Sequence, residues 1–331
     1  MAGSDALYGL GLDTTKIETM YYYMVLSRAL DERMWILNRQ GKSAFVISCQ
    51  GQEGAQVGVA SALDPTVDWV APYYRDLGVV LYFGMTPREI MLGQMAKAED
   101  PSSGGRQMPA HYGHKKRHVL TGSSPVATQV AHAAGMALAF KIRSEAAVVM
   151  TSLGEGSTNQ GEFHEALNFA AVHRLPLIVV VENNGFAISV PQSKEMVVAD
   201  VAAKASGYGM PGIVVRGSDP LGVHQATSEA RNRALKGEGP TLIEIKTYRY
   251  TPHSSDDDDR SYKTREQLQA EKDDDAIVLF RQWMLDQKMW DDEREKALNQ
   301  RVRNEVDDAT DYAEAAPYPD PATLWEHVYH S

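Results

Sequence analysis

Two short polar clusters follow apolar segments that are typical of buried strands. Gly154-Glu155-Gly156 comes after the apolar run 146–153, and Asn183-Asn184 comes after the run 176–181. In an open parallel sheet, ligands bind at the carboxyl ends of the strands, so a carboxylate and two carboxamides should meet at one edge. Glu155, Asn184 and a backbone carbonyl near Phe186 are oxygen ligands that suit Mg²⁺, and glycines let a phosphate approach the backbone. The pattern predicts a metal–phosphate site; the alternative is two ordinary turns, because Asn-Asn-Gly is a common turn sequence.

His253 is the best candidate for acid–base chemistry among the ten histidines. It follows a strand-like segment and precedes Ser254, Ser255 and four consecutive aspartates at 256–259. Nearby carboxylates favour the protonated imidazole, and a histidine with a pKa near neutrality suits proton transfer and anion stabilisation. The alternative is a solvated histidine in an acidic loop, and the aspartate run itself is expected to be solvated and mobile.

Three further histidines, His111, His114 and His118, have a spacing that could suggest a metal site. The residues 115–117 between them are Lys, Lys and Arg, and these cations would repel a metal ion. We therefore interpret this stretch as a basic loop near the ligand site or its entrance.

Strand-like and helical segments alternate through the middle of the chain. Strands are expected at 146–153, 176–181, 213–216 and 241–248, and helices at 127–141, 162–173 and 221–236. Short apolar strands alternating with helices predict an α/β fold whose parallel sheet has helices on both faces.

Helical segments flank this core. The first is expected from residue 15 to about Asn38, with Thr15 and Glu18 as a capping box and Gly41 at its end. Its aromatic run at 21–23 wraps most of the circumference, which favours burial on several sides, with another subunit as one candidate neighbour. We expect an N-terminal helical arm at 1–44, a core domain at 45–252, and an acidic loop with a C-terminal helical arm at 253–331.

Composition narrows the class of protein. The 331 residues carry 33 Lys+Arg and 44 Asp+Glu, a net charge of −11, which argues against nucleic-acid binding. The single cysteine, Cys49, permits no internal disulfide and no cysteine-based zinc site, as expected in a reducing cytoplasm. We see no signal-peptide pattern in the first residues and no apolar run of about 18 residues, so a cytoplasmic protein without membrane spans is expected.

Several long motifs resemble one enzyme family. A Gly-[Asp/Glu]-Gly cluster followed by Asn-Asn is similar to the thiamin diphosphate (ThDP) motif. The wider matches are TSLGEGSTNQGEFHEALNFAA, ENNGFAIS, GGRQMPAHYGHKKRHVLTGSSPVATQ, YYRDLGVVLY and YRYTPHSSDDDD. Together they resemble the alpha subunit of the branched-chain 2-oxo acid dehydrogenases, from about residue 15 to the end. The resemblance implies a ThDP-binding α/β fold.

The resemblance also implies a metal and cofactor site. Glu155 and Asn184 would bind Mg²⁺ with the Phe186 carbonyl as third protein ligand, and this branch has Glu155 where most ThDP enzymes have Asp. Tyr74 and Arg75 would lie at the cofactor, where a guanidinium fork suits diphosphate oxygens. From the residues alone, Arg75 reads as a surface arginine paired with Asp76. Contacts are also implied for Gly154, Gly156, Ser157 and Ile188.

One residue departs from the family pattern. The family places a second diphosphate-binding arginine directly before Asn-Asn, and Glu182 stands at that place. An anion cannot replace this cation, so we expect a different grip on the diphosphate.

The segment before the helix at 127–141 matches a further part of the family site. Ser124 and the Val126 backbone would face the aminopyrimidine ring. Ser123, Pro125 through its carbonyl, Thr128 and Gln129 resemble a structural potassium site. Read without the family, this stretch is a Ser/Thr-rich helix N-cap with Pro near the first turn.

The resemblance gives His253 and Ser254 roles beside the cofactor. The matching histidine lies next to the thiazolium ring, where covalent intermediates form. Ser254 matches a position that is phosphorylated in animal relatives, and phosphate there would add negative charge beside His253.

The implied assembly is an α2β2 heterotetramer with ThDP between alpha and beta subunits. We expect a chain of this length with one βαβ core to hold one of the two cofactor-binding domains, and the resemblance implies that the glutamate that ionises the cofactor comes from the beta subunit. The implied reaction is oxidative decarboxylation of 3-methyl-2-oxobutanoate and its homologues. The acyl group then passes to lipoyl-lysine on the acyltransferase core.

Three alternatives remain at this stage. The nearest is the alpha subunit of pyruvate or acetoin dehydrogenase, with the same chemistry on another 2-oxo acid. A nucleotide-binding oxidoreductase lacks its fingerprint, since no G-x-G-x-x-G follows a strand with an acidic residue about 20 positions later. A non-catalytic scaffold is disfavoured by intact Glu155, Asn184, Arg75 and His253.

Overall fold

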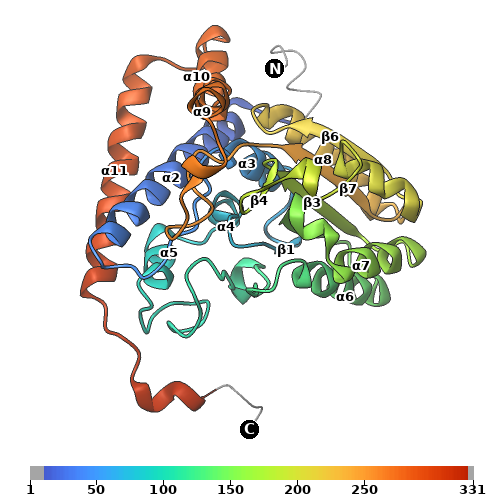
Figure 1. Ribbon diagram of the computed structural model, residues 1–331, viewed down its shortest axis with the longest axis horizontal. Coiled ribbons are helices and arrows are strands. Elements are labelled where there is room, and N and C mark those ends of the chain that lie inside the picture. Colours follow the sequence, from blue (N-terminus) through green and yellow to red (C-terminus); the bar gives the residue numbers. More distant parts are fainter. Residues whose placement is uncertain (1–10, 327–331) are drawn as a thin grey trace.

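A five-stranded parallel sheet forms the centre of the molecule in a computed structural model that describes residues 11–326 (Figure 1). The strand order is β1-β2-β3-β7-β6. The strands are β1 (Trp69–Ala71), β2 (Val149–Gly154), β3 (Leu177–Asn183), β6 (Gly212–Arg216) and β7 (Thr241–Lys246), and β4 (Phe186–Ala187) pairs with β5 (Val190–Pro191) in a separate antiparallel hairpin. The predicted parallel sheet is confirmed.

Ten helices surround the sheet within the described residues. They are α2 (Thr14–Arg39), α3 (Glu53–Ser61), α4 (Leu77–Tyr82), α5 (Pro87–Gln94), α6 (Thr128–Arg143), α7 (Gly161–Val172), α8 (Pro220–Leu235), α9 (Arg265–Asp273), α10 (Ala276–Asp286) and α11 (Asp292–Ala315). The helices predicted at 127–141, 162–173 and 221–236 correspond to α6, α7 and α8 within two residues at each end.

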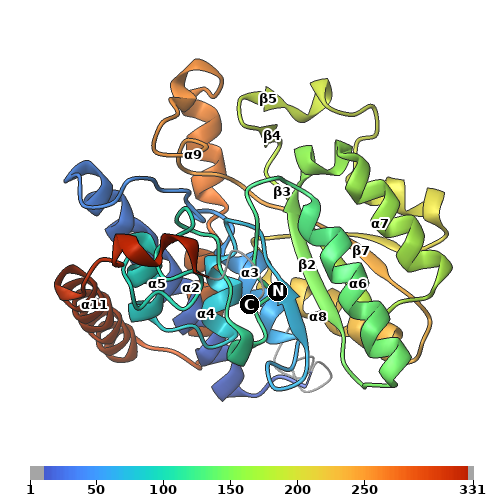
Figure 2. The same ribbon diagram turned by 90° about the horizontal axis from the view of Figure 1, so that it is seen from below.

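Alternate residues of each central strand enter two separate hydrophobic clusters, because strand side chains point to opposite faces in turn. In β3, Ile178 and Val180 face one cluster, whereas Val179 and Val181 face the other. Figure 2 shows α6 and α7 on one side of the strands and α8 on the opposite side. Helices on both faces bury the sheet, as predicted, and leave the strand ends available for a site.

The N-terminal helix begins differently from the prediction. Asp13 is the N-cap of α2 and accepts a hydrogen bond from the Lys16 amide at 2.8 Å. The predicted capping box of Thr15 and Glu18 is wrong, because Thr15 already lies inside the helix. The C-terminal prediction is confirmed: Gly41 has a φ of +74°, and its amide donates to the Asn38 carbonyl.

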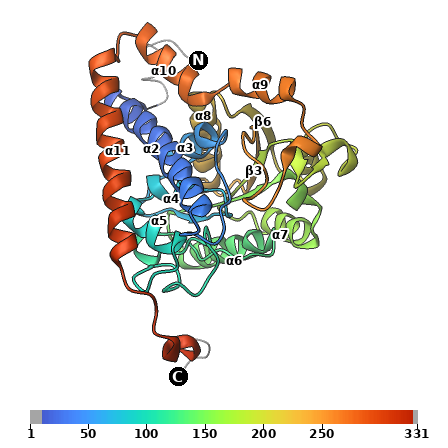
Figure 3. The same ribbon diagram turned by 60° about the vertical axis from the view of Figure 1, so that its left-hand side comes forward.

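Helix α2 is buried by other parts of the same chain. Figure 3 shows α11 alongside it. Tyr21 donates to Glu295 of α11 at 3.1 Å, and Tyr22 donates to Glu305 at 2.5 Å. The aromatic run therefore packs against the chain's own C-terminal helix, and its contact with another subunit stays a prediction. Both helices share a hydrophobic cluster with α3, α4 and α5. The division into a core and two arms at residues 44 and 252 stays a prediction.

Two expectations from the sequence concern the ends of the chain and the absence of membrane-spanning helices. The pattern read in the first ten residues, and the last five residues of the tail, lie outside the described residues. Among residues 11–326, no helix combines the length and the apolar character needed to cross a membrane.

Candidate active site

A cavity of about 360 Å³ opens at the carboxyl ends of β1, β2, β3 and β7. Every residue that the sequence assigned to the cofactor or Mg²⁺ lines it: Tyr74, Arg75, Ser124, Val126, Gly154, Glu155, Gly156, Ser157, Asn184, Phe186, Ile188 and His253. A larger groove of about 530 Å³ lies between α2 and α11, but none of these residues lines it. The strand-end cavity is therefore the candidate site.

Glu155 and Asn184 each direct a buried oxygen into this region without a hydrogen-bond partner. Glu155 Oε2 accepts from the Asn184 amide at 3.2 Å, but Glu155 Oε1 and Asn184 Oδ1 have none. Burial raises the pKa of Glu155 to about 7. Buried polar atoms are normally paired, so two unpaired oxygens lining one cavity fit a cation with oxygen ligands.

The two asparagines do not act together, which corrects the expectation that both carboxamides meet the ligand. Asn183 Nδ2 donates to Gln192 at 2.9 Å and to Glu244 at 2.6 Å. Its Oδ1 accepts from the Gly185 amide at 3.0 Å. Asn183 therefore fixes the turn after β3, and Asn184 alone presents an oxygen to the cavity.

Glu195 holds the peptide that carries the third expected metal ligand. The Ala187 amide donates to Glu195 Oε1 at 2.7 Å, and this N–H belongs to the same planar peptide as the Phe186 carbonyl. Gly156 packs against this hairpin so closely that a Cβ there would lie 2.4 Å from the Cβ of Ala187. The hairpin and the turn after β2 therefore fit together only with glycine at 156.

Arg75 is a buried cation rather than a surface arginine. Its residue is 2% exposed, and it donates to the Ser48 carbonyl at 2.7 Å and to His253 Nδ1 at 3.0 Å. The predicted alternative of a surface pair with Asp76 is wrong, because Asp76 is turned toward Ser152 and the Tyr73 amide.

Arg249 is the functional candidate that sequence reasoning missed. It follows β7, lines the cavity, is 1% exposed and leaves its Nε without a partner. Its Nη2 donates to Tyr262 and to the carbonyl of Ile188, both at 2.8 Å. Ile188 itself has a φ of +56°, an uncommon conformation for a β-branched residue. A single arginine after an apolar strand carries no signal that it points inward.

The two buried arginines lack a carboxylate partner. Among residues 11–326, neither Arg75 nor Arg249 forms an ion pair, and burial together with Arg75 lowers the pKa of Arg249. Buried charges are normally paired. The pair therefore makes the cavity favourable for an anion that carries more than one negative charge, such as a diphosphate.

Glu182 does not line the cavity. Its buried carboxyl accepts from Tyr73 at 3.1 Å and from Gln56 at 3.2 Å. Burial and the nearby Asp76 raise its pKa well above the usual range. Glu182 therefore points away from the cavity, whereas Arg249, which follows β7, adds a second cation to its lining.

His253 is neutral, which corrects the expectation of a protonated ring. Burial, followed by Arg75 and Arg249, lowers its pKa to about 4, and Asp257 opposes this only weakly. Guanidinium groups can only donate, so His253 Nδ1 accepts from Arg75 at 3.0 Å and from Arg249 at 3.4 Å. The ring proton therefore resides on Nε2, which makes that nitrogen a hydrogen-bond donor.

The aspartate run is partly structural rather than fully solvated. Asp257 accepts from the His253 amide at 2.8 Å and from the Tyr262 hydroxyl at 2.5 Å, and Asp259 is buried. Asp256 and Asp258 are exposed, as expected. Ser254, the position that resembles a phosphorylation site, is 7% exposed. Contacts from Arg249 through Tyr262 and Asp257 thus connect the cavity to the loop that carries His253.

The three histidines of the basic loop have separate contacts. His111 Nε2 contacts Ser124 Oγ at 2.6 Å, His114 contacts Glu89 at 3.2 Å, and His118 stacks on Trp69. Within the described part of the chain, no group of three His, Cys, Asp or Glu side chains could hold a metal ion. His111 instead supports Ser124 at the cavity rim.

No side chain of the segment before α6 caps the N-terminus of this helix. Ala127 is the N-cap of α6, with a φ of +73°, so the predicted Ser/Thr N-cap is wrong. The four residues expected to bind a potassium ion make hydrogen bonds within the chain. Ser123 donates to the Pro125 carbonyl at 3.4 Å, Thr128 to Glu162 at 3.5 Å, and Gln129 to the Ser152 carbonyl at 2.8 Å. The potassium site stays a prediction.

Comparison with known proteins assigns the chain to a family. Residues 21–322 match the model of the dehydrogenase E1 component. The chain is 53% identical over 320 residues to the 2-oxoisovalerate dehydrogenase subunit alpha of Bacillus subtilis, covering 97% of both chains. It is 40% identical to the mitochondrial human subunit of that name, over 96% of this chain and 71% of the human one. It is 39% identical to the 3-methyl-2-oxobutanoate dehydrogenase subunit alpha of Mycobacterium tuberculosis, over 91% of this chain and 80% of that protein. The chain therefore belongs to the dehydrogenase E1 component family, as its motifs predicted, and within it to the alpha subunits of branched-chain 2-oxo acid dehydrogenases.

Proposed function

We propose that this chain is the alpha subunit of the decarboxylase component of a branched-chain 2-oxo acid dehydrogenase that uses ThDP and Mg²⁺. The observation that carries the proposal is the composition of the strand-end cavity. It combines two buried oxygens that lack partners, on Glu155 and Asn184, with two buried cations that lack carboxylates, Arg75 and Arg249. A magnesium–diphosphate group would satisfy both sets at once.

Each residue has a role that follows from its chemistry. Glu155, Asn184 and the Phe186 carbonyl would hold Mg²⁺, and Arg75 with Arg249 would hold diphosphate oxygens. When bound, the thiazolium of ThDP supplies the electron sink that decarboxylation of a 2-oxo acid requires. The Nε2–H group of neutral His253 would donate a hydrogen bond to an oxygen that gains negative charge.

The same cavity indicates that the chain holds half of an active site. Among the described residues that line it, Glu155 is the only carboxylate. If Glu155 binds the metal, no carboxylate is left in the lining to ionise the cofactor through its aminopyrimidine. A beta subunit would supply that group in an α2β2 assembly, which agrees with the relatives' designation as alpha subunits.

The substrate class rests on the relatives. Those reported above are named for 2-oxoisovalerate or 3-methyl-2-oxobutanoate, two names for one branched-chain 2-oxo acid. We propose that substrate and its homologues, with transfer of the acyl group to lipoyl-lysine of a cytoplasmic acyltransferase core. The pyruvate and acetoin enzymes, the earlier alternative, are not favoured by these similarities.

The test measures decarboxylation with an artificial electron acceptor, using the chain with and without its beta subunit. Both reactions contain ThDP and Mg²⁺, and the substrates are 3-methyl-2-oxobutanoate and pyruvate. We expect activity only with the partner and a higher kcat/KM for the branched substrate. A preference for pyruvate would contradict the substrate class, and activity of the chain alone would contradict the half-site.

A further inference from the structure

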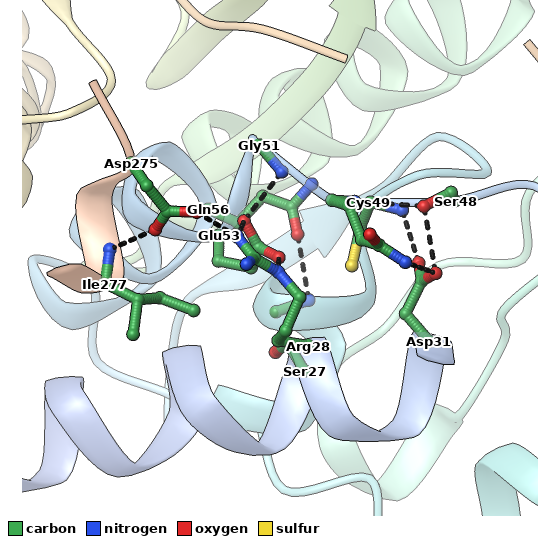
Figure 4. A network of polar contacts seen from close by, with 12 residues as sticks. Ser27, Arg28, Asp31, Ser48, Cys49, Gly51, Glu53, Gln56, Asp275 and Ile277 are labelled. Carbon is green, nitrogen blue, oxygen red and sulfur yellow. Dashed lines mark hydrogen bonds and ion pairs between the residues drawn. The ribbon is translucent and has the colours of Figure 1, made fainter. Parts of the chain in front are cut away.

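Asp31 of α2 contacts the segment that connects this helix to α3, and Arg28 of α2 contacts Glu53 at the start of α3 (Figure 4). Asp31 is fully buried, and the Arg28 side chain is 21% exposed. Burying charge is unfavourable unless the charge gains specific partners. We call residues 46–52 the connecting segment; it is largely buried and has no regular secondary structure. The contacts of Asp31 with this segment, and of Arg28 with Glu53, thus offset a desolvation cost that apolar residues would avoid.

Asp31 binds three consecutive residues of the connecting segment. Its carboxylate accepts from the Ser48 hydroxyl at 2.9 Å, the Cys49 amide at 2.6 Å and the Gln50 side chain at 3.0 Å. No cation forms an ion pair with Asp31 within the part of the chain that the structure describes. Hydrogen bonds from the segment therefore offset the cost of burying this carboxylate.

Arg28 reaches the same segment one helical turn earlier, through Glu53 at the start of α3. Arg28 Nη2 lies 3.0 Å from Glu53 Oε2, which also accepts from the Gly51 amide at 2.9 Å. The same guanidinium contacts Asp275 before α10 at 3.0 Å. Arg28 and Asp31 therefore hold both ends of residues 48–51.

The opposite side of the connecting segment contacts the candidate active site. The Ser48 carbonyl accepts from Arg75 at 2.7 Å. The Gln50 carbonyl accepts from the amide of Tyr250, next to Arg249, at 3.2 Å, and the Val46 carbonyl accepts from Ser255 at 2.9 Å. One segment thus lies between α2 on one side and, on the other, the Arg75 guanidinium and the backbone near Arg249 and His253.

We propose that Asp31 is a positioning residue for the anion side of the cavity. By fixing the backbone at residues 48–50, it places the Ser48 carbonyl where it orients the Arg75 guanidinium. Without this acceptor, Arg75 would keep only His253, through Nδ1 and the carbonyl, as a partner, and its remaining N–H groups would be aimed less firmly at a diphosphate. This inference rests on the proposed function, because the diphosphate is part of that proposal.

The experiment measures the Kd of ThDP and of thiamin monophosphate at saturating Mg²⁺, by tryptophan fluorescence, on the chain purified with its beta subunit. The variants are Asp31→Ala, Asp31→Asn, Arg75→Gln and the double variant Asp31→Ala/Arg75→Gln. Asp68→Ala is the matched control. Asp68 is also fully buried and accepts from backbone amides, those of Val148 and Asp64, but it precedes β1 at the other end of the sheet and, unlike Asp31, also pairs with Arg231 at 2.6 Å.

We expect Asp31→Ala to raise the Kd of ThDP about tenfold and that of thiamin monophosphate less, because the lost interaction is with the second phosphate. Asp31→Asn, which keeps an acceptor for the Cys49 amide, should stay within about threefold. Asp31→Ala should add little to Arg75→Gln, since both remove the same interaction. Asp68→Ala should lower the Tm without changing either Kd.

Equal losses for both ligands, full additivity with Arg75→Gln, or the same Kd change in Asp68→Ala would show that Asp31 is merely structural and overturn the inference. If Asp31→Ala does not fold, Ser48→Ala removes one of the three contacts and should show a smaller change with the same non-additivity. A wild-type complex that fails to bind ThDP would contradict the proposed function, whereas wild-type binding with unaffected variants would contradict only the role of Asp31.

Discussion

The ionisation of Glu155 links metal binding to pH. Its carboxyl has a pKa of about 7 without metal because it is buried, and a carboxyl group must lose its proton to bind Mg²⁺ strongly. We therefore expect the affinity for Mg²⁺ in the presence of ThDP to fall about tenfold for each pH unit below about 7 and to level off above it. Titration of Mg²⁺ between pH 5.5 and 8.5 checks this. Glu155→Gln should bind weakly with no such slope, and an unchanged slope in that variant would remove Glu155 from the metal site.

Arg249 should contribute to diphosphate binding through charge and geometry. A hydrogen bond to a charged group contributes about 1.5–3 kcal/mol, so Arg249→Gln should raise the Kd of ThDP by about one to two orders of magnitude. Arg249→Lys should recover part of this, because the charge remains but the planar fork is lost. Calorimetric titration with ThDP and Mg²⁺ measures both. Arg143→Gln, an exposed arginine at the end of α6, is the control. Wild-type affinity in Arg249→Gln would leave Arg75 as the sole candidate cation.

At the scale of elements, the turn after β2 and the β4–β5 hairpin must fit together. A Cβ on Gly156 would lie 2.4 Å from the Cβ of Ala187, whereas one on Gly154 meets no atom within 4 Å. Overpacking costs about 1–3 kcal/mol, so Gly156→Ala should lower the Tm of the cofactor-free chain. It should also weaken Mg²⁺ binding, since the hairpin carries the Phe186 carbonyl. Gly154 has a φ of −80°, which alanine adopts readily, so Gly154→Ala should leave the Tm almost unchanged. Equal Tm values in the two variants would contradict the tight packing.

The same elements show how far the sequence predicts the fold. Strands β2, β3 and β7 and helices α6 to α8 follow from apolar runs and helical periodicity. Strand β1 and helices α3 to α5 did not: β1 has three residues, and the nine residues of α3 are all buried, so no polar face marks its period. Short and fully buried elements lack the contrast on which such predictions depend.

The candidate site also has features that the sequence predicts and features that it does not. Strand ends and motifs brought together the predicted cofactor residues, all of which line one cavity. Contacts between residues far apart in the sequence were not predictable: Asn183 is held by Glu244, Glu182 by Gln56, and His253 by Arg75. The pKa of His253 illustrates the reason. The aspartates next to it in sequence predict a raised pKa, but burial, the distant Arg75 and Arg249 four residues earlier lower it.

At the scale of the whole molecule, the cavity makes the stability of the cofactor-free chain depend on pH. The folded pKa of His253, about 4, lies below the unfolded value of 6.5, so its contribution to stability is lost as pH falls from about 6.5 to 4. The folded pKa of Glu155, about 7, lies above the unfolded value of 4.5, so its contribution is lost as pH rises from about 4.5 to 7. The two groups therefore act in opposite directions over most of this window.

Glu155→Gln separates these contributions in the intact chain. Glutamine keeps an acceptor for the Asn184 amide and cannot ionise, so only the Glu155 contribution disappears. A pKa difference of about 2.5 units corresponds to about 3 kcal/mol at most. We therefore expect the variant to gain stability relative to wild type as pH rises from 4.5 to 7, with a constant difference above 7. Denaturant unfolding without cofactor at several pH values measures the gap. Saturating ThDP and Mg²⁺ should reverse its sign, because they stabilise the wild type and bind the variant weakly. A gap independent of pH would mean that the carboxyl is ionised freely in the folded chain, and the buried charge would then not explain why this cavity needs a cation.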